Sequence, residues 1–310
     1  MFLPEELARA AARAPIYRSR RSPRASGGGR ALGLWPVTDL ETLLRGTDGR
    51  DDPFGGRRDP LRPAKVILQV ADGLPLYWAL GRRDMEGAAQ ALAHCWRQLD
   101  IGPGDRVAIY DYGTSPLTLF ASSSYLPYLR AGAADLIGCT PICNDGLPEL
   151  AARAIHLLKY VRPQVMFANA EAMEALLAQA AGARSHLDGL ACTIVVSADE
   201  QAIRPEQMAR WRQGLGLPVR QLLRADAGLF LAAPCAVCDA HHASEHHYLL
   251  EVLSEDGHEA LPAGEVGLLT VTNLFVKTCP IIRYVTEVRA ALAPARGSCG
   301  AGNFTIRIAE

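Results

Sequence analysis

The sequence predicts an α/β protein in which a doubly wound, mostly parallel sheet is followed by a smaller β-rich subdomain. Between residues 65 and 225, runs of strand length alternate with single helical patterns, as in parallel sheets with helices on both faces. After Ala225 the helical patterns stop, and short strands separated by turns follow. We therefore expect an N-terminal helical and loop segment at 1–64, an α/β core at 65–225 and a β-rich subdomain with a Cys/His cluster at 226–310.

The first segment is predicted to contain two short helices on either side of a basic loop. Helical spacing covers Glu5 to Arg13, and a second short helix begins after Thr38. The stretch SRRSPRASGGGR between them is rich in glycine and arginine, which is typical of a solvated loop. The core then opens with two strands, KVILQV and LPLYWAL, joined by the turn ADG, and with a helix over 84–100.

The remaining elements follow from alternating strand and helix patterns. The predicted core strands are RVAIYDY, ADLIGCTPI, QVMFAN, CTIVVS and PVRQLL. The predicted core helices run over 116–131, 147–160, 170–181 and 206–214. The predicted strands of the β-rich subdomain are GLFLAAP, HYLLEVLSEDG, EVGLLTVTNL and CPIIRYVT.

Composition and charge exclude several kinds of partner. The formal net charge is -1, and 21% of the residues are charged, so we expect no nucleic-acid partner. The N-terminus has no apolar run suited to a signal peptide, and no window approaches the roughly 20 apolar residues of a membrane span. We expect a cytoplasmic protein with no membrane partner, whose eight cysteines are mostly reduced.

Several segments occur in an order that is similar to one group of enzymes. RAPIYR is similar to an early P-F-Y-R element, and LDIGPGDRVAIYDYG and ADLIGCTPI are similar to segments that build a first sheet. EVGLLTVTNL and PIIRYVTE are similar to a G-E-G-E-L-V run followed by R-Y-R-T. In this order the segments resemble the phenylacetate-CoA ligase group of the adenylate-forming superfamily. The resemblance covers nearly the whole chain and implies the fold of that superfamily's N-terminal domain.

The chain departs from this family where ATP phosphates bind. The family uses a loop rich in serine, threonine and glycine, with a lysine, because N–H groups, hydroxyls and a positive charge stabilise phosphates. The matching stretch is QVADGLP, in which Gly73 and Pro75 are kept but Leu74 stands where the lysine would be. Asp72 adds a negative charge where phosphate would bind, which is repulsive.

Three further departures remove groups that the family uses in the same step, the adenylation of the acid with ATP. Phe230 and Leu231 replace the hydroxyl and the magnesium-binding glutamate of a Y-G-x-[ST]-E element. Val288 replaces the aspartate that binds the ribose, with Glu287 beside it. The family's mobile C-terminal domain, which carries the adenylation lysine, is expected to be absent. The resemblance therefore implies a ligase-like protein that binds no ATP.

The function that fits these losses is acyl transfer between thiols. We expect an aryl group, such as anthraniloyl or benzoyl, to move from coenzyme A to the phosphopantetheine thiol of an acyl carrier protein, as in pathways of secondary metabolism. Exchange of one thioester for another is nearly neutral in free energy, so ATP is not needed. Two alternatives stay open: an ATP-dependent aryl-CoA ligase with a divergent phosphate loop, and a non-catalytic ligase-like scaffold.

The cluster CAVCDAHHASEHH, together with a distant cysteine, is a candidate zinc site. Some members of the resembled group hold a structural zinc with cysteine and histidine ligands, and tetrahedral zinc takes four such ligands. The resemblance places Cys235, His242 and Cys299 at ligand positions, with Cys238, His246 or His247 available as the fourth. A solvated loop and a catalytic cluster are the competing interpretations.

Candidate catalytic and substrate-binding residues follow from strand ends. Cys143 lies just after a predicted parallel strand, where open α/β sheets bind ligands, and is our candidate nucleophile, with Cys279 as an alternative. His247 is a candidate base, and direct attack by the carrier thiol would need only a base and an oxyanion donor. By analogy with the family's acyl pocket, Tyr112, Gly113 and Phe120 are candidate substrate-binding residues.

Overall fold

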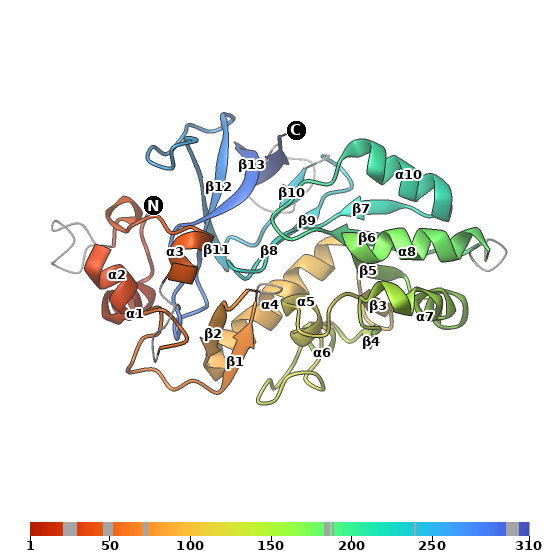
Figure 1. Ribbon diagram of the computed structural model, residues 1–310, viewed down its shortest axis with the longest axis horizontal. Coiled ribbons are helices and arrows are strands. Elements are labelled where there is room, and N and C mark those ends of the chain that lie inside the picture. The colour runs from red at the N-terminus through yellow and green to blue at the C-terminus, as the bar shows by residue number, and fades with distance from the viewer. Residues whose placement is uncertain are drawn as a thin grey trace.

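The computed structural model describes residues 1–20, 30–45, 52–70, 74–182, 187, 189–238, 240–295 and 304–309. In Figure 1 the N-terminal helices lie on the left, the parallel strands with their covering helices on the right, and the antiparallel strands at the top. No helix in these ranges combines the length and the apolar character needed to cross a membrane. The predicted α/β class, with a mostly parallel sheet and a separate β-rich part, is confirmed.

The N-terminal segment packs as a small helical layer. Its elements are α1 (Glu5–Arg13), α2 (Pro15–Arg20), the 3₁₀ turn η2 (Leu32–Leu34) and α3 (Leu40–Arg45). Leu7, Tyr17 and Trp35 form an apolar cluster that includes Ile282, which comes from the far end of the chain. The Tyr17 hydroxyl donates to the main-chain oxygen of Pro280 at 3.0 Å. This layer is therefore fixed to the β-rich part by burial and by a buried hydrogen bond. The predicted basic loop falls largely outside the described residues.

A hairpin and one long helix follow. The strands β1 (Val66–Gln69) and β2 (Tyr77–Leu80) pair antiparallel, as predicted. Helix α4 (Arg82–Gln98) is preceded by the capping residue Gly81, whose N–H donates to the Asp84 carboxylate at 2.8 Å. Trp96 stacks on Phe167 of the parallel sheet, with ring centroids 5.5 Å apart. On its other side α4 contacts the antiparallel sheet, so this helix forms a buried layer between the two sheets.

The parallel sheet has five strands in the order β4-β3-β5-β6-β7. Its strands are β3 (Arg106–Tyr110), β4 (Thr140–Cys143), β5 (Val165–Asn169), β6 (Thr193–Ser197) and β7 (Val219–Gln221). The chain runs outward from β3 in both directions, so β3 and β5 meet at a topological switch point. Ligands of open α/β sheets bind outside the carboxyl ends of the strands at such a point.

Helices cover both faces of this sheet. One face packs against α7 (Ala151–His156), α8 (Ala170–Ala181) and α10 (Pro205–Leu215), as Figure 1 shows. The helical turns η3 (Pro148–Leu150) and η4 (Leu157–Val161) extend α7 at its two ends. The other face packs against α4. The predictions for 147–160, 170–181 and 206–214 are confirmed within a few residues.

The helix predicted over 116–131 is wrong. Helix α5 (Pro116–Leu119) ends after one turn. Pro127 has no N–H to continue a helix, and Tyr128 has a φ of 70°, which no right-handed helix contains. Apolar spacing alone did not reveal these interruptions.

The strand predicted over 134–142 is wrong in its first half. Helix α6 (Ala133–Ile137) forms there, because the Asp135 carboxylate accepts from the N–H of Gly132 at 2.7 Å and of Ser123 at 2.8 Å. Gly138, with a φ of 86°, ends this helix. Only Thr140–Cys143 forms the strand β4.

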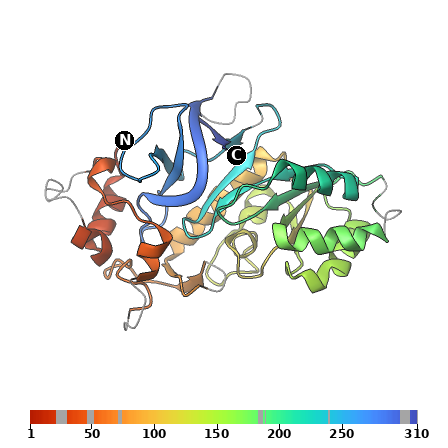
Figure 2. The ribbon, with the colours of Figure 1, turned by 45° about the horizontal axis from the view of Figure 1, so that its top comes forward.

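The antiparallel sheet has seven strands in the order β11-β12-β13-β14-β10-β9-β8. They are β8 (Leu223–Ala225), β9 (Phe230–Pro234), β10 (His241–His242), β11 (Tyr248–Leu253), β12 (Val266–Asn273), β13 (Tyr284–Pro294) and β14 (Phe304–Ile308). Figure 2 shows the strong bend of β13. β13 begins later than predicted, directly after Arg283, whose φ of 49° interrupts the extended chain. The largest apolar core draws residues from before 65, from 65–225 and from beyond 226, and the domain division stays a prediction.

Replacement of Gly87 by alanine tests the packing of α4 between the sheets. A Cβ at this position would lie 2.4 Å from the Cβ of Phe275, so we expect Gly87→Ala to lower the free energy of unfolding by about 1–3 kcal/mol. Urea unfolding measures this change. Gly33→Ala is the control, because a Cβ there meets nothing within 4 Å. A Gly87→Ala protein as stable as the wild type would contradict this packing.

Candidate functional site

A polar cavity of about 350 Å³ lies at the carboxyl ends of the parallel strands. Loops after β3, β5 and β6 form one wall, and β8 forms another, which places the cavity at the switch point. The side chains that give it its character are Tyr112, Glu171, Ser197, Asp199, Arg224 and Asp226. This position and polarity make it the candidate active site.

A buried arginine organises the floor of the cavity. Arg224 is 4% exposed, and its Nη1 donates to Oδ2 of Asp111 at 2.5 Å. Its Nη2 lies 3.4 Å from Oδ2 of Asp226, and the N–H of Asp226 donates to Oδ1 of Asp199 at 2.8 Å. One positive charge therefore neighbours three carboxylates that come from three separate loops.

These contacts shift the pKa values of Arg224 and of the neighbouring carboxyl groups. Burial lowers the pKa of Arg224, but the carboxylates of Asp111, Asp226 and Asp199 raise it by more. Burial raises the pKa of Asp226, and the neighbouring carboxylates add to this effect while Arg224 opposes it. Burial likewise raises the pKa of Asp199. The cavity thus holds carboxyl groups that keep a proton more readily than exposed ones do.

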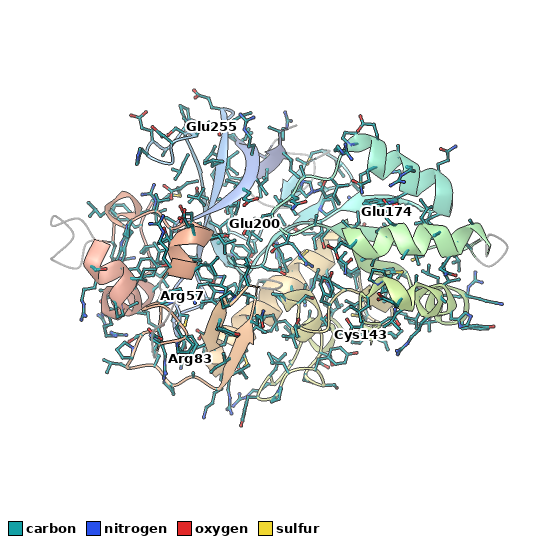
Figure 3. The ribbon with its side chains drawn as sticks, viewed as in Figure 1. Arg57, Arg83, Cys143, Glu174, Glu200 and Glu255 are labelled. Carbon is teal, nitrogen blue, oxygen red and sulfur yellow. The ribbon has the colours of Figure 1, made fainter. Side chains whose placement is uncertain are left out.

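Glu200 lies next to this group, near the centre of the molecule in Figure 3. Its Oε1 accepts from the Tyr284 hydroxyl at 2.5 Å, and its Oε2 accepts from the N–H of Glu287 at 3.0 Å. Burial raises the pKa of Glu200 to about 7, and the Asp199 carboxylate contributes. Glu200 therefore ties β13 to the loop that forms one cavity wall.

The predicted substrate-binding residues are divided between two neighbouring spaces. Tyr112 lines the cavity, and its hydroxyl donates to Oε2 of Glu171 at 2.6 Å. Gly113 lies beside the cavity, and its N–H donates to Oδ1 of Asp145 at 3.3 Å. Phe120 lies in an adjoining apolar crevice lined also by Phe230. Asp226 lines both spaces, so they share one wall.

The predicted catalytic residues do not line the cavity. Cys143 ends the edge strand β4 and is half-buried (Figure 3). Burial raises the pKa of its thiol, although a hydrogen bond with Tyr125 opposes the shift. Nδ1 of His247 hydrogen-bonds to the Ser244 hydroxyl at 2.7 Å, and burial lowers the pKa of His247 to about 4. The catalytic roles of Cys143 and His247 stay predictions.

Three of the four predicted metal ligands come together. The ligand atoms of Cys235, Cys238 and His242 lie within 4.8 Å of one another. Nδ1 of His242 donates to the main-chain oxygen of Phe304 at 3.0 Å, which leaves Nε2 facing Sγ of Cys238 at 3.2 Å. This tautomer and orientation suit a metal-binding histidine. Cys299 lies outside the described residues.

Comparisons with known structures identify the fold. Comparison with protein-family models gives no match, and comparison with curated protein sequences gives none. A crystal structure of 2-hydroxyisobutyryl-CoA ligase with 2-HIB-AMP and CoA superposes with a TM-score of 0.78 at 18% identity, over 98% of this chain and 71% of that chain. A second structure of this ligase, in the thioesterification state, gives 0.79 at 18% identity, over 98% of this chain and 65% of that chain. The chain has the acyl-CoA ligase fold.

Two aryl-CoA ligases share this fold more distantly. Anthranilate-CoA ligase AuaEII, solved with anthranoyl-AMP, gives a TM-score of 0.53 at 14% identity, over 81% of this chain and 47% of that chain. A benzoate-CoA ligase from Burkholderia xenovorans LB400 gives 0.51 at 15% identity, over 80% and 50%. The acyl-CoA ligase fold predicted from the sequence resemblance is confirmed, and the chain spans half to about two thirds of these ligases.

Most of the described positions that the resemblance associates with ATP are apolar, and the polar Gln69 is an exception. Phe230 is 1% exposed and meets Tyr248 edge to face, with ring centroids 5.0 Å apart. Val288 is buried in the same core. Gln69, from the segment matched to the phosphate loop, lines the cavity, and Leu74 packs against the core. Asp72 and Gly73 fall outside the described residues.

Most charged residues in and below the cavity were not predicted from the sequence. Asp111, Glu171 and Asp199 each follow within two residues of a parallel strand's end, and carboxyl ends of parallel strands meet at one edge. That shared position was a signal available in the sequence. Arg224 and Asp226 carried no such signal, because β8 joins the other sheet.

Replacement of Glu200 by glutamine tests its raised pKa. With a pKa of about 7 instead of 4.5, the folded protein keeps this proton while the unfolded chain loses it. Below pH 4.5 this difference leaves the folded protein at its full stability. As the pH rises toward 7, the free energy of unfolding falls by up to about 3 kcal/mol. We expect Glu200→Gln to show a smaller loss of unfolding free energy than the wild type between pH 5 and 7.5 in urea titrations.

The control for this experiment is Glu206→Gln, which removes an exposed carboxylate from α10. We expect it to keep the wild-type dependence on pH. If the Glu200→Gln protein loses as much stability over this range as the wild type, Glu200 does not hold the proton.

Proposed function

We propose that the protein is an acyltransferase that moves an aryl group from coenzyme A to the phosphopantetheine thiol of an acyl carrier protein, without ATP. The observation that carries the proposal is the burial of Phe230. Its ring is packed against Tyr248 at the position where the resembled ligases carry a hydroxyl, beside Leu231 in place of their magnesium-binding glutamate. The acyl-CoA ligase fold supports a CoA thioester as substrate, since related structures contain CoA.

The cavity offers proton acceptors for thioester exchange. The carrier thiol loses its proton as its sulfur bonds to the acyl carbon; the bond from that carbon to the CoA sulfur then breaks, and CoA leaves as a thiol after taking up a proton. The reaction has one thioester and one thiol among its reactants and the same among its products, so no further reactant is consumed. Asp199 and Asp226 line the cavity, and their raised pKa values suit groups that accept and return this proton.

Direct transfer fits the arrangement better than a covalent acyl-enzyme. The predicted nucleophile Cys143 is not among the residues that line the cavity, and burial raises its pKa, which disfavours a thiolate. Intact-protein mass spectrometry after mixing with benzoyl-CoA distinguishes the two routes. An acyl adduct that disappears in Cys143→Ala would establish the covalent route through this residue.

The transferase proposal predicts activity without nucleotide. We expect benzoyl-CoA or anthraniloyl-CoA with a phosphopantetheinylated carrier protein to give acyl-carrier by mass spectrometry in the absence of ATP. A heat-denatured sample controls for spontaneous exchange. Titration calorimetry should detect no ATP binding, because the cavity's carboxylates repel phosphates.

Two other outcomes would replace this proposal. Measurable ATP affinity together with pyrophosphate exchange would favour an ATP-dependent aryl-CoA ligase. A stable complex with the carrier protein but no acyl transfer would favour a scaffold.

We also propose that Cys235, Cys238, His242 and Cys299 hold a structural zinc. Two cysteines and an oriented histidine suit zinc, and the N–H of Val237 donates to Sγ of Cys235 at 3.4 Å. The metal would join the turn between β9 and β10 to the end of the chain. His247 lies outside this group of ligand atoms.

Elemental analysis tests the zinc site. We expect about one zinc per chain, reduced severalfold in Cys238→Ala and His242→Ala, with a lower melting temperature because metal binding stabilises the fold. His258→Ala, which removes an exposed histidine elsewhere, should keep its zinc. A zinc-free protein with an unchanged melting temperature after chelation would contradict the proposal.

A further inference from the structure

The cavity is acidic where a ligand would lie. Glu171, Asp199 and Asp226 line it together with one arginine. That arginine is already paired with Asp111, which has no place in the cavity lining. The single positive charge of Arg224 is shared between Asp111 and Asp226, and the carboxyl groups around the cavity outnumber it. Such a surface attracts a cation and repels phosphate.

A second observation, independent of the carboxylates, indicates a ligand. Ser197 ends β6, lines the cavity and is 2% exposed. Among the described residues its hydroxyl has no hydrogen-bond partner, and its oxygen is not fully enclosed by protein, so it is reachable from the cavity. The Ser197 hydroxyl is thus available to a polar group held in the cavity.

The carboxyl groups are arranged for an organic cation rather than for a metal ion. Among described residues, the cysteine and histidine cluster is the sole group of three or more Cys, His, Asp or Glu side chains whose ligand atoms lie within 4.8 Å of one another. Glu171, Asp199 and Asp226 do not form such a group. Its volume of about 350 Å³ falls within the range of small-molecule pockets, roughly 300–1,000 Å³.

We propose that this cavity recognises a protonated amino group on the acyl portion of the substrate, which makes the protein selective for amine-bearing aryl thioesters. This inference rests on the proposed function, because it assumes that the acyl group enters the cavity. In the part of the chain that the structure describes, Arg224 is the one positive charge beside Asp111, Asp199 and Asp226, so the ammonium group would add a second one. Glu171 at the more exposed end would be a further acceptor. Charge-assisted hydrogen bonds of this kind are about twice as strong as neutral ones.

Binding of two matched amides tests the inference without requiring transfer. Titration calorimetry at pH 7.5 would compare 4-(aminomethyl)benzamide, a cation, with the neutral 4-methylbenzamide. We expect the cation to bind at least tenfold more tightly. Glu171→Gln should reduce this preference severalfold and Asp226→Asn should reduce it at least tenfold, while binding of the neutral amide changes little.

Controls separate recognition from folding. Glu206→Gln removes the same charge from the exposed face of α10 and should keep the preference. Circular dichroism and the melting temperature establish that each variant is folded. Glu171 is exposed at the start of α8, so its replacement keeps the test valid if Asp226→Asn does not fold.

The outcomes distinguish this inference from the proposed function. Equal binding of the two amides, or a preference that survives Glu171→Gln and Asp226→Asn, would overturn the inference. A strong preference for the cation without acyl transfer from 4-(aminomethyl)benzoyl-CoA would support amine recognition and contradict the transferase proposal. Equal transfer of 4-methylbenzoyl and 4-(aminomethyl)benzoyl groups, with no preference in binding, would support the transferase and overturn the inference.

Discussion

The buried guanidinium of Arg224 holds together the segments that form the cavity. Arg224 lies in β8, which pairs with β9 of the antiparallel sheet, while its side chain reaches Asp111 beyond the end of β3 in the parallel sheet. Its main-chain oxygen accepts from the N–H of Glu200 at 3.0 Å. An unpaired buried charge is strongly destabilising, so the guanidinium and its carboxylates fix one another's positions. The charge of the cavity and the joining of the two sheets at this edge depend on this one residue.

The middle layer of the molecule makes this arrangement rigid. Helix α4 packs against the parallel sheet through Trp96 and against the antiparallel sheet through the close approach of Gly87 and Phe275. Because a well-packed core resists changes in volume, the two sheets keep a fixed separation. The apolar crevice of Phe120 and Phe230 beside the cavity is formed in the same layer. That crevice has a volume of only about 10 Å³, so it is a gap in the packed layer and the polar cavity is the space left for a ligand.

The chemistry of the site is consistent across its parts. Where the resembled ligases place oxygen atoms around a nucleotide and its metal, this chain buries a phenyl ring and a valine side chain. The remaining polar surface is acidic, and neighbouring carboxylates raise one another's pKa, which suits proton exchange better than phosphate binding. The cysteine and histidine cluster lies in the turn after β9 and is separate from the cavity lining. It fits the proposed structural role, and the carboxyl groups are the proposed reactive part of the site.

The sequence by itself determined the elements whose patterns are local. Alternating strands and helices, the hairpin of β1 and β2, and the Cys-x2-Cys spacing all follow from periodicity and composition, and the order of motifs indicated the acyl-CoA ligase fold. The early end of α5 and the helix α6 were missed, because a proline, a left-handed tyrosine and an aspartate cap outweigh apolar spacing. Only the tertiary structure brought Arg224 to Asp111, residues 113 positions apart. The pairing of buried charges depends on how strands from two sheets meet, and no local pattern encodes that.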